Sequence, residues 1–152
     1  MTFRTASDLA RDLRAGRIDP VELAEQALDR IEAVGDPAIF TEVTRDRALA
    51  EARAARERLR AGIPSSLLDG VPVAWKDLFG LKGRVTTAGS VVLKSNPPEA
   101  EDAALVGAAS RAGMVSIGCV NMTEFAYSGI GINPHYGTPR NPHDRADRKS
   151  VV

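Results

Sequence analysis

Two short apolar segments with a helix-like segment between them constrain the fold of this chain more than any other feature. The runs 71–76 (VPVAWK) and 114–120 (MVSIGCV) have the length and the apolar, β-branched character of buried strands. Segment 101–112 (EDAALVGAASRA) is built of small and apolar residues, has acids in its first turn and is followed by glycine, which predicts a buried helix. This order predicts a βαβ unit with parallel strands and a right-handed crossover, and therefore an α/β protein.

Helices are predicted for most of the chain before this unit. Apolar residues recur at helical spacing over 5–31, where Asp19 can cap a new helix and Pro20 suits its first position. Segment 45–61 is rich in alanine, leucine, glutamate and arginine and predicts a further helix. The composition changes near residue 65, which predicts an N-terminal helical segment at 1–64, an α/β domain at 65–146 and a divergent tail at 147–152.

The arginines of the predicted helix 45–61 allow two interpretations. They could form a nucleic-acid-binding patch, but Arg47 lies four residues before Glu51. Arg53 likewise lies four residues before Glu57, and such pairs neutralise each other on a helix. A solvated helix face is therefore the preferred interpretation.

Composition places the chain among globular proteins with no general attraction for polyanions. Of its 152 residues, 43% are hydrophobic and 26% are charged, and 20 basic residues balance 20 acidic ones. No signal-peptide pattern or apolar run of about 20 residues is present, which argues against a membrane partner. The single cysteine, Cys119, excludes an internal disulfide, and we expect a cytoplasmic protein.

Lys76 ends the first predicted strand and is followed by Asp77. The plain interpretation is a strand-end lysine whose ammonium group reaches water or pairs with Asp77. The alternative is a buried lysine, because loss of water disfavours the ammonium and leaves a neutral, basic amine. Lowering the pKa of a lysine from about 10.4 to about 7 costs roughly 4–5 kcal/mol, which proteins usually meet only at functional sites. Spacing alone favours the plain interpretation.

Three ordered motifs change this weighing: LDGVPVAWKDLFGLKG at 68–83, TTAGS at 86–90 and GCVNMTEFAYSGIGINPHYGTPRNP at 118–142. Together they resemble the amidase signature family, and the resemblance runs from about residue 5 to residue 146. The family implies an α/β scaffold with a mixed, mainly parallel sheet that later segments complete. It also implies a Ser-cisSer-Lys triad, in which a neutral lysine draws a proton through the cis serine from the nucleophilic serine. Lys76 occupies the lysine position, and no metal or organic cofactor is implied.

The two serines of that triad cannot be placed in this sequence. The family continues with a Gly-Gly-Ser-Ser-rich segment and later a Gly-Gly-Ser, whereas residues 147–152 (DRKSVV) contain no glycine. Ser150 beside Lys149 is a poor substitute, because a chain terminus neither excludes water nor fixes the geometry. We therefore expect a truncated or frameshifted product that is inactive by itself.

Other chemistry-bearing residues have weaker support. Cys119 with His135 or His143 has the residue types of a thiol hydrolase, but a cysteine inside an apolar strand is usually structural. No third ligand accompanies the histidines, so no metal site is expected. The glycines at 129 and 131 lack the preceding strand and third glycine of a dinucleotide-binding loop.

The segment 125–129 (FAYSG) is similar to the part of the family that lines the acyl side of the substrate pocket. Tyr127, Ser128 and Gly129 are the candidate substrate-binding residues that this similarity implies. A connecting loop anchored by one tyrosine is an equally good interpretation of each residue.

Three hypotheses about function follow. The first is an amidase acting on a small linear amide. In this case the chain is one portion of the enzyme and needs either a C-terminal portion with the serines and the rest of the sheet or a second copy in a homodimer. The second is an interaction module, because the family includes glutamyl-tRNA amidotransferase A subunits, which work in multi-subunit assemblies. The third is a non-functional remnant of an amidase gene. The sequence does not identify the substrate.

Overall fold

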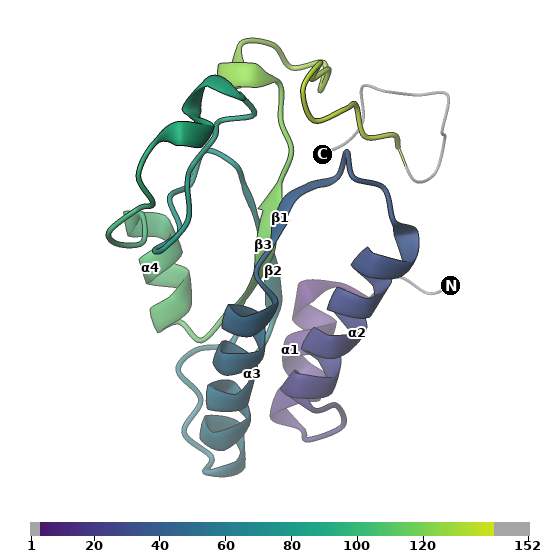
Figure 1. Cartoon of the computed structure of the whole chain (residues 1–152). Coiled ribbons are helices and arrows are strands. Elements are labelled where there is room, and N and C mark those ends of the chain that lie inside the picture. The colour runs from purple at the N-terminus through teal and green to yellow at the C-terminus, as the bar shows by residue number, and fades with distance from the viewer. Residues whose placement is uncertain (1–3, 142–152) are drawn as a thin grey trace. The chain divides into compact units, whose positions relative to one another are not determined.

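The computed structural model describes residues 4–141 of the chain (Figure 1). Its elements follow in the order α1 (Ala6–Arg14), α2 (Pro20–Val34), β1 (Phe40–Val43), α3 (Arg45–Arg60), β2 (Pro72–Lys76), η1 (Val92–Ser95), α4 (Ala104–Arg111), β3 (Val115–Val120) and η2 (Glu124–Ala126). The described residues thus form an α/β structure, and the predicted fold class is confirmed.

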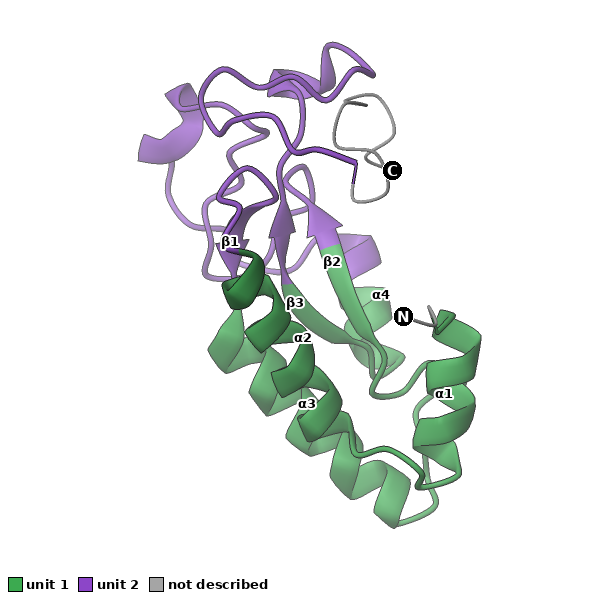
Figure 2. Ribbon diagram, turned by 90° about the vertical axis from the view of Figure 1, so that its right-hand side faces the viewer, with its two compact units in different colours: residues 1–34, 44–74, 107–117 green, residues 35–43, 75–106, 118–152 purple. Residues whose placement is uncertain are grey.

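Two compact units make up the described chain, each assembled from segments that are distant in sequence (Figure 2). Unit 1 comprises the described parts of residues 1–34, 44–74 and 107–117. Unit 2 comprises the described parts of residues 35–43, 75–106 and 118–152. The helices α1, α2 and α3 therefore belong to unit 1, whereas Lys76 and the segments that follow it belong mainly to unit 2.

The strands β2 and β3 are parallel neighbours. The backbone N–H of Val115 donates to the carbonyl oxygen of Val71, and the N–H of Asp77 donates to that of Val120, each over 3.0 Å. From the first bond to the second, the residue numbers rise on both strands, which shows that the strands are parallel. Because α4 lies between these strands in the chain, the predicted βαβ unit is confirmed.

A strand that the sequence did not predict, β1, pairs with the other edge of β3. The pairing is antiparallel, with Phe40 opposite Val120 and Val43 opposite Gly118, so the sheet is mixed and has the order β1-β3-β2. Gly118 permits this close approach, because a Cβ atom there would lie 2.5 Å from the carbonyl oxygen of Glu42.

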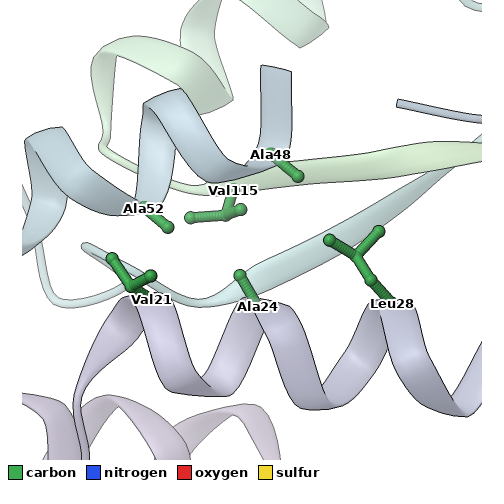
Figure 3. Packing of buried hydrophobic residues seen from close by; sticks show 6 residues of the cluster. All are labelled: Val21, Ala24, Leu28, Ala48, Ala52 and Val115. Atoms are coloured by element: carbon green, nitrogen blue, oxygen red, sulfur yellow. The ribbon is translucent and has the colours of Figure 1, made fainter. Parts of the chain in front are cut away.

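The main core of unit 1 lies where α2 and α3 pack against β3 (Figure 3). Small side chains on the facing sides of the helices allow close packing, and the larger Leu28 and Val115 fill the space between them. Full burial of one such valine or leucine contributes roughly 1.5–3 kcal/mol. The cluster consists of Val21, Ala24, Leu28, Ala48, Ala52 and Val115.

The arginines of α3 are paired more widely than the sequence indicated. Arg47 and the glutamate four residues later form the predicted ion pair, at 2.9 Å. Arg56, however, binds Asp19 at the start of α2, and Arg58 binds the buried Asp69. The predicted solvated face therefore does not include Arg56 or Arg58.

The helix predicted at 101–112 is shorter and less buried than expected. Val106 is the buried residue of α4, whereas Leu105 is 56% exposed. The expected acids of the first turn lie before the helix, because the carboxylate of Asp102 accepts the backbone N–H of Lys82 at 2.8 Å. This bond holds the residues before α4 to the 80–83 segment instead of extending the helix.

Candidate active site

Lys76 is the last residue of β2 and its side chain is exposed. The residues on both sides of it are buried: Trp75 is 7% exposed and packs edge-on against Phe79, and Asp77 is 1% exposed. The carbonyl oxygen of Lys76 accepts the N–H groups of Leu78 and Phe79 at 2.7 and 3.0 Å. The backbone at Lys76 is thus fixed, while the described residues do not provide the burial that a neutral lysine needs.

Asp77 forms the centre of a buried polar network. Its carboxylate accepts the hydroxyl of Thr87 in a short hydrogen bond, the N–H of Thr87 at 3.3 Å and the N–H of Gly89 at 3.5 Å. Its own N–H is bound to β3. No hydrogen bond or ion pair joins Asp77 to the Lys76 side chain within residues 4–141, so of the two plain alternatives the exposed lysine fits reaching water and not pairing with Asp77.

Asn133 connects the TTAGS motif to the segment after β3. Its buried side-chain NH2 donates to the carbonyl oxygens of Gly89 and Met122, both at 2.7 Å. Its side-chain oxygen accepts the N–H groups of His135 and Tyr136 at 2.8 and 3.0 Å. One amide therefore holds three backbone segments together.

The Tyr136 hydroxyl extends the same network. It donates to Oγ1 of Thr87 over 3.2 Å, and the Tyr136 ring lies beneath the ammonium group of Lys94, 4.8 Å from its centroid. The resulting chain of hydrogen bonds runs from Tyr136 through Thr87 to Asp77. It fixes the loop that follows Lys76 by contacts on both sides.

Glu124 carries a second, smaller cluster. The buried hydroxyl of Ser90 donates to its carboxylate at 2.6 Å, and Nε2 of His135 lies 3.3 Å from the same oxygen. The cluster ties the TTAGS motif to the segment 124–135.

The candidate substrate-binding residues lie on a loop that starts with unusual backbone. Tyr127 is 93% exposed, Gly129 is exposed and Ser128 is half-buried. Just before them, Phe125 and Ala126 adopt left-handed φ angles of 54° and 56°. Within residues 4–141, no hydrogen bond joins Lys76 to residues 127–129.

The left-handed backbone has a counterpart in the TTAGS motif. Ala88 has a φ of 50°, and its carbonyl oxygen accepts the N–H of Phe125 at 2.8 Å. A residue other than glycine in this region costs of order 1–3 kcal/mol and is held there only by surrounding contacts. Such backbone is enriched at functional sites, so the contact between Ala88 and Phe125 marks this loop pair as a candidate site.

Cys119 has the environment of a structural thiol. It is 1% exposed, and burial raises the pKa of its thiol despite the nearby guanidinium of Arg84, whose Nη1 lies 2.8 Å from Sγ. Arg84 also pairs with Glu42. The thiol is therefore protonated at neutral pH and is not an activated nucleophile.

The other nucleophile and ligand candidates gain no structural support. His143, Lys149 and Ser150 lie outside the described residues. Among residues 4–141 no three histidine, cysteine, aspartate or glutamate side chains lie close enough to hold a metal ion. No helix in the same part of the chain is long and apolar enough to cross a membrane.

The sequence singles out Lys76 as a candidate but does not reveal the polar network beside it. Its motifs indicate Asp77 only as a possible ion-pair partner of the lysine and Thr87 only as part of TTAGS, and they do not single out Asn133 or Tyr136. The available signal was the concentration of Thr, Ser and Asn near the ends of both predicted strands, since buried polar side chains are almost always hydrogen-bonded.

A family model described as Amidase matches residues 22–149 of the chain. The A subunit of glutamyl-tRNA(Gln) amidotransferase from Chromobacterium violaceum is 44% identical over 146 residues. That match covers 95% of this chain and 30% of the relative. The 1-carboxybiuret hydrolase subunit AtzE of Pseudomonas sp. (strain ADP) is 41% identical over 138 residues, covering 90% of this chain and 30% of the relative.

Solved structures agree with these matches. One of them is the structure of a vestigial protein complex that reveals the evolutionary origins of an s-triazine catabolic enzyme. It superposes with a TM-score of 0.89 at 39% sequence identity, and the match covers 93% of this chain and 31% of the chain in that structure. A peptide amidase with bound chymostatin has a TM-score of 0.82 at 31% identity and covers 93% of this chain and 30% of its own. The chain thus spans about 30% of the length of the relatives that it matches.

Proposed function

The chain belongs to the amidase family, and on this premise we propose that it carries the lysine base of a site that cleaves or transfers amide C–N bonds. The observation that supports this role most is the position of Lys76 between two buried neighbours, Trp75 and Asp77. The backbone hydrogen bonds fix the point from which the lysine side chain extends, and the exposed side chain is free to reach a reacting group.

In the proposed mechanism Lys76 acts as a neutral amine. Its Nζ takes a proton from the bridging serine, which takes one from the nucleophilic serine as that oxygen attacks the amide carbonyl. As the C–N bond breaks, the leaving amine takes one proton from the bridging serine, and Lys76 returns a proton to that serine. The acyl group is then bound to the nucleophilic serine, and the lysine is again neutral. Neither serine can be assigned to a position in this sequence, and we propose that the chain alone is inactive.

We further propose that Tyr127, Ser128 and Gly129 contact the acyl part of a small linear amide. The loop 125–132 contains no charged residue and exposes Phe125, Ile130 and Ile132. This composition favours a neutral acyl group over a charged one, because desolvating a charge without a partner is costly.

A second candidate function is that of a subunit in a larger assembly. Two relatives are named as subunits, of an amidotransferase and of a hydrolase, and one similar structure is of a protein complex. A second copy of this chain, in a homodimer, is an alternative partner to a different subunit. In either case we propose a cytoplasmic location, because the protein has a single cysteine and balanced charge.

The proposed role of Lys76 is tested by joining residues 1–141 to the remaining C-terminal part of the 1-carboxybiuret hydrolase subunit. We expect the chimera to hydrolyse members of a panel of small linear amides. Lys76→Ala should lower kcat/KM by about 10²-fold or more, the usual cost of losing a general base. Lys76→Arg should be equally inactive, because a guanidinium is not deprotonated in proteins.

Lys82→Ala is the matched control, since Lys82 is another exposed lysine of unit 2. Its turnover should stay within about twofold of the parent chimera, as expected for a residue remote from the reaction. If Lys76→Ala kept turnover at the level of this control, Lys76 would not be the base.

A further inference from the structure

Three arginines and one aspartate line a groove in unit 1. It is lined by the end of α1, the 15–20 segment and the last turns of α3, and its volume is about 460 Å3. This volume falls within the roughly 300–1,000 Å3 of small-molecule sites. Arg14, Arg56 and Arg60 supply the positive charges, and Asp19 supplies the carboxylate.

The single carboxylate contacts two of the three arginines, one much more closely than the other. Nη2 of Arg56 donates to Oδ1 of Asp19 over 2.6 Å, whereas Nη2 of Arg60 lies 3.9 Å from Oδ2. Asp19 also accepts the N–H groups of Val21 and Glu22 at the start of α2. Its oxygens are therefore shared among several donors and cannot satisfy all three guanidinium groups.

Arg14 and Arg60 keep donors available in the groove. Arg14 is exposed and forms no hydrogen bond or ion pair with any residue in 4–141, and the side chain of Arg60 is 66% exposed. Glu22 and Glu25 act on Arg56 electrostatically from outside the groove, and neither lines it.

We propose that this arginine groove binds the phosphate group of a small phosphorylated molecule. The lining has two positive charges in excess, which favours a dianion over a monoanion. Guanidinium groups bind phosphate oxygens with paired, charge-assisted hydrogen bonds, and three of them can surround one phosphate.

The arginine groove lies entirely in unit 1, and phosphate binding there is independent of the proposed amide chemistry. The arginines of α3 differ in whether they line this groove. Arg56 and Arg60 line the groove, whereas Arg53 is exposed on the same helix and does not line it. Arg53 therefore provides a control with the same charge on the same helix.

The test is a titration of the 152-residue chain with inorganic phosphate at constant ionic strength, followed by amide NMR shifts. We expect saturable shifts of residues that line the groove. Arg60→Gln should weaken binding about tenfold, the effect of losing one charge-assisted hydrogen bond, and Arg53→Gln less than about twofold. Linear, unsaturable shifts would overturn the proposal, as would equal effects of the two substitutions.

Two further measurements sharpen the result. Asp19→Asn removes the competing charge but keeps a good helix cap, so it should tighten phosphate binding. Unchanged or weaker binding by this variant would contradict a site in which Asp19 competes with phosphate. A single-stranded RNA that shifted the same amides at concentrations where phosphate did not would show that a small phosphorylated ligand is the wrong assignment.

Discussion

Arg58 and Asp69 form a two-point ion pair in which Nε donates to Oδ2 over 2.8 Å and Nη2 donates to Oδ1 over 2.7 Å. Asp69 is 1% exposed, and its Oδ2 also accepts the N–H of Ser65 at 2.7 Å. The hydrogen bond with Asp69 raises the pKa of Arg58, so the guanidinium stays charged. The pair joins the end of α3 to the segment that leads into β2.

Arg58→Ala is predicted to lower the free energy of unfolding by about 3–5 kcal/mol, because it leaves a buried carboxylate without its partner. Urea unfolding at neutral pH measures the change. Arg53→Ala, on the exposed part of the same helix, should change it by no more than about 0.5 kcal/mol. Similar losses in the two variants would mean that the buried pair has no special role.

Gly113→Ala is predicted to disturb the same ion pair from the other side. Gly113 has a φ of +85°, and a Cβ atom there would lie 2.3 Å from Oδ1 of Asp69. We expect a loss of about 3 kcal/mol, the sum of the left-handed backbone cost and the displaced hydrogen bonds. Gly16 is the control, since its φ is +66° but no atom lies within 4 Å, and Gly16→Ala should cost only about 1–2 kcal/mol.

Local signals allowed the helices before the sheet to be predicted well. Asp19 and Pro20 mark the start of α2, and in the structure Asp19 accepts the N–H groups of Val21 and Glu22 as a cap does. Such signals act over three or four residues, so they can be read from the sequence directly. The alternation between apolar strands and the small-residue helix indicated the βαβ unit in the same way.

Long-range pairing explains what was missed. β1 is only four residues long, and its partner β3 lies more than 70 residues later, so the sequence near β1 contains no signal for the pairing. The buried network of Asp77, Thr87 and Asn133 likewise joins segments from different parts of the chain. Residue types indicated that polar groups were present, but which of them meet is decided by the fold.

The stability of unit 1 should fall in acid partly through Asp19. Its pKa is lowered: although partial burial acts to raise it, the hydrogen bonds from Arg56 and from the backbone of Val21 and Glu22 outweigh burial. A carboxylate with a lowered folded pKa stabilises the fold above its unfolded pKa of about 3.9 and loses this contribution as the pH falls through the folded value.

Asp19→Asn tests this linkage, because asparagine keeps the cap but does not titrate. The difference in unfolding free energy between the parent and this variant should be greatest near about pH 7 and should shrink as the pH falls below the unfolded pKa of about 3.9. Urea unfolding across this range measures it. A difference that stayed constant with pH would show that the charge of Asp19 is not responsible.

The hydrogen bond between Thr87 and Asp77 should couple the two residues energetically. Thr87→Val keeps the side-chain shape but leaves the Asp77 carboxylate without its hydroxyl donor and Tyr136 without its acceptor, so we expect a loss of about 2–3 kcal/mol. Asp77→Asn should cost less, because its amide oxygen still accepts one hydrogen bond.

In the double variant the losses should fall short of additivity by about 1–2 kcal/mol, the range found for contacting residues. Tyr136→Phe, which removes only the outer end of the chain, should cost about 1 kcal/mol. Urea unfolding of the parent, the two single variants and the double variant measures the coupling between Thr87 and Asp77, and strict additivity of Asp77→Asn and Thr87→Val would contradict a network that acts as one unit.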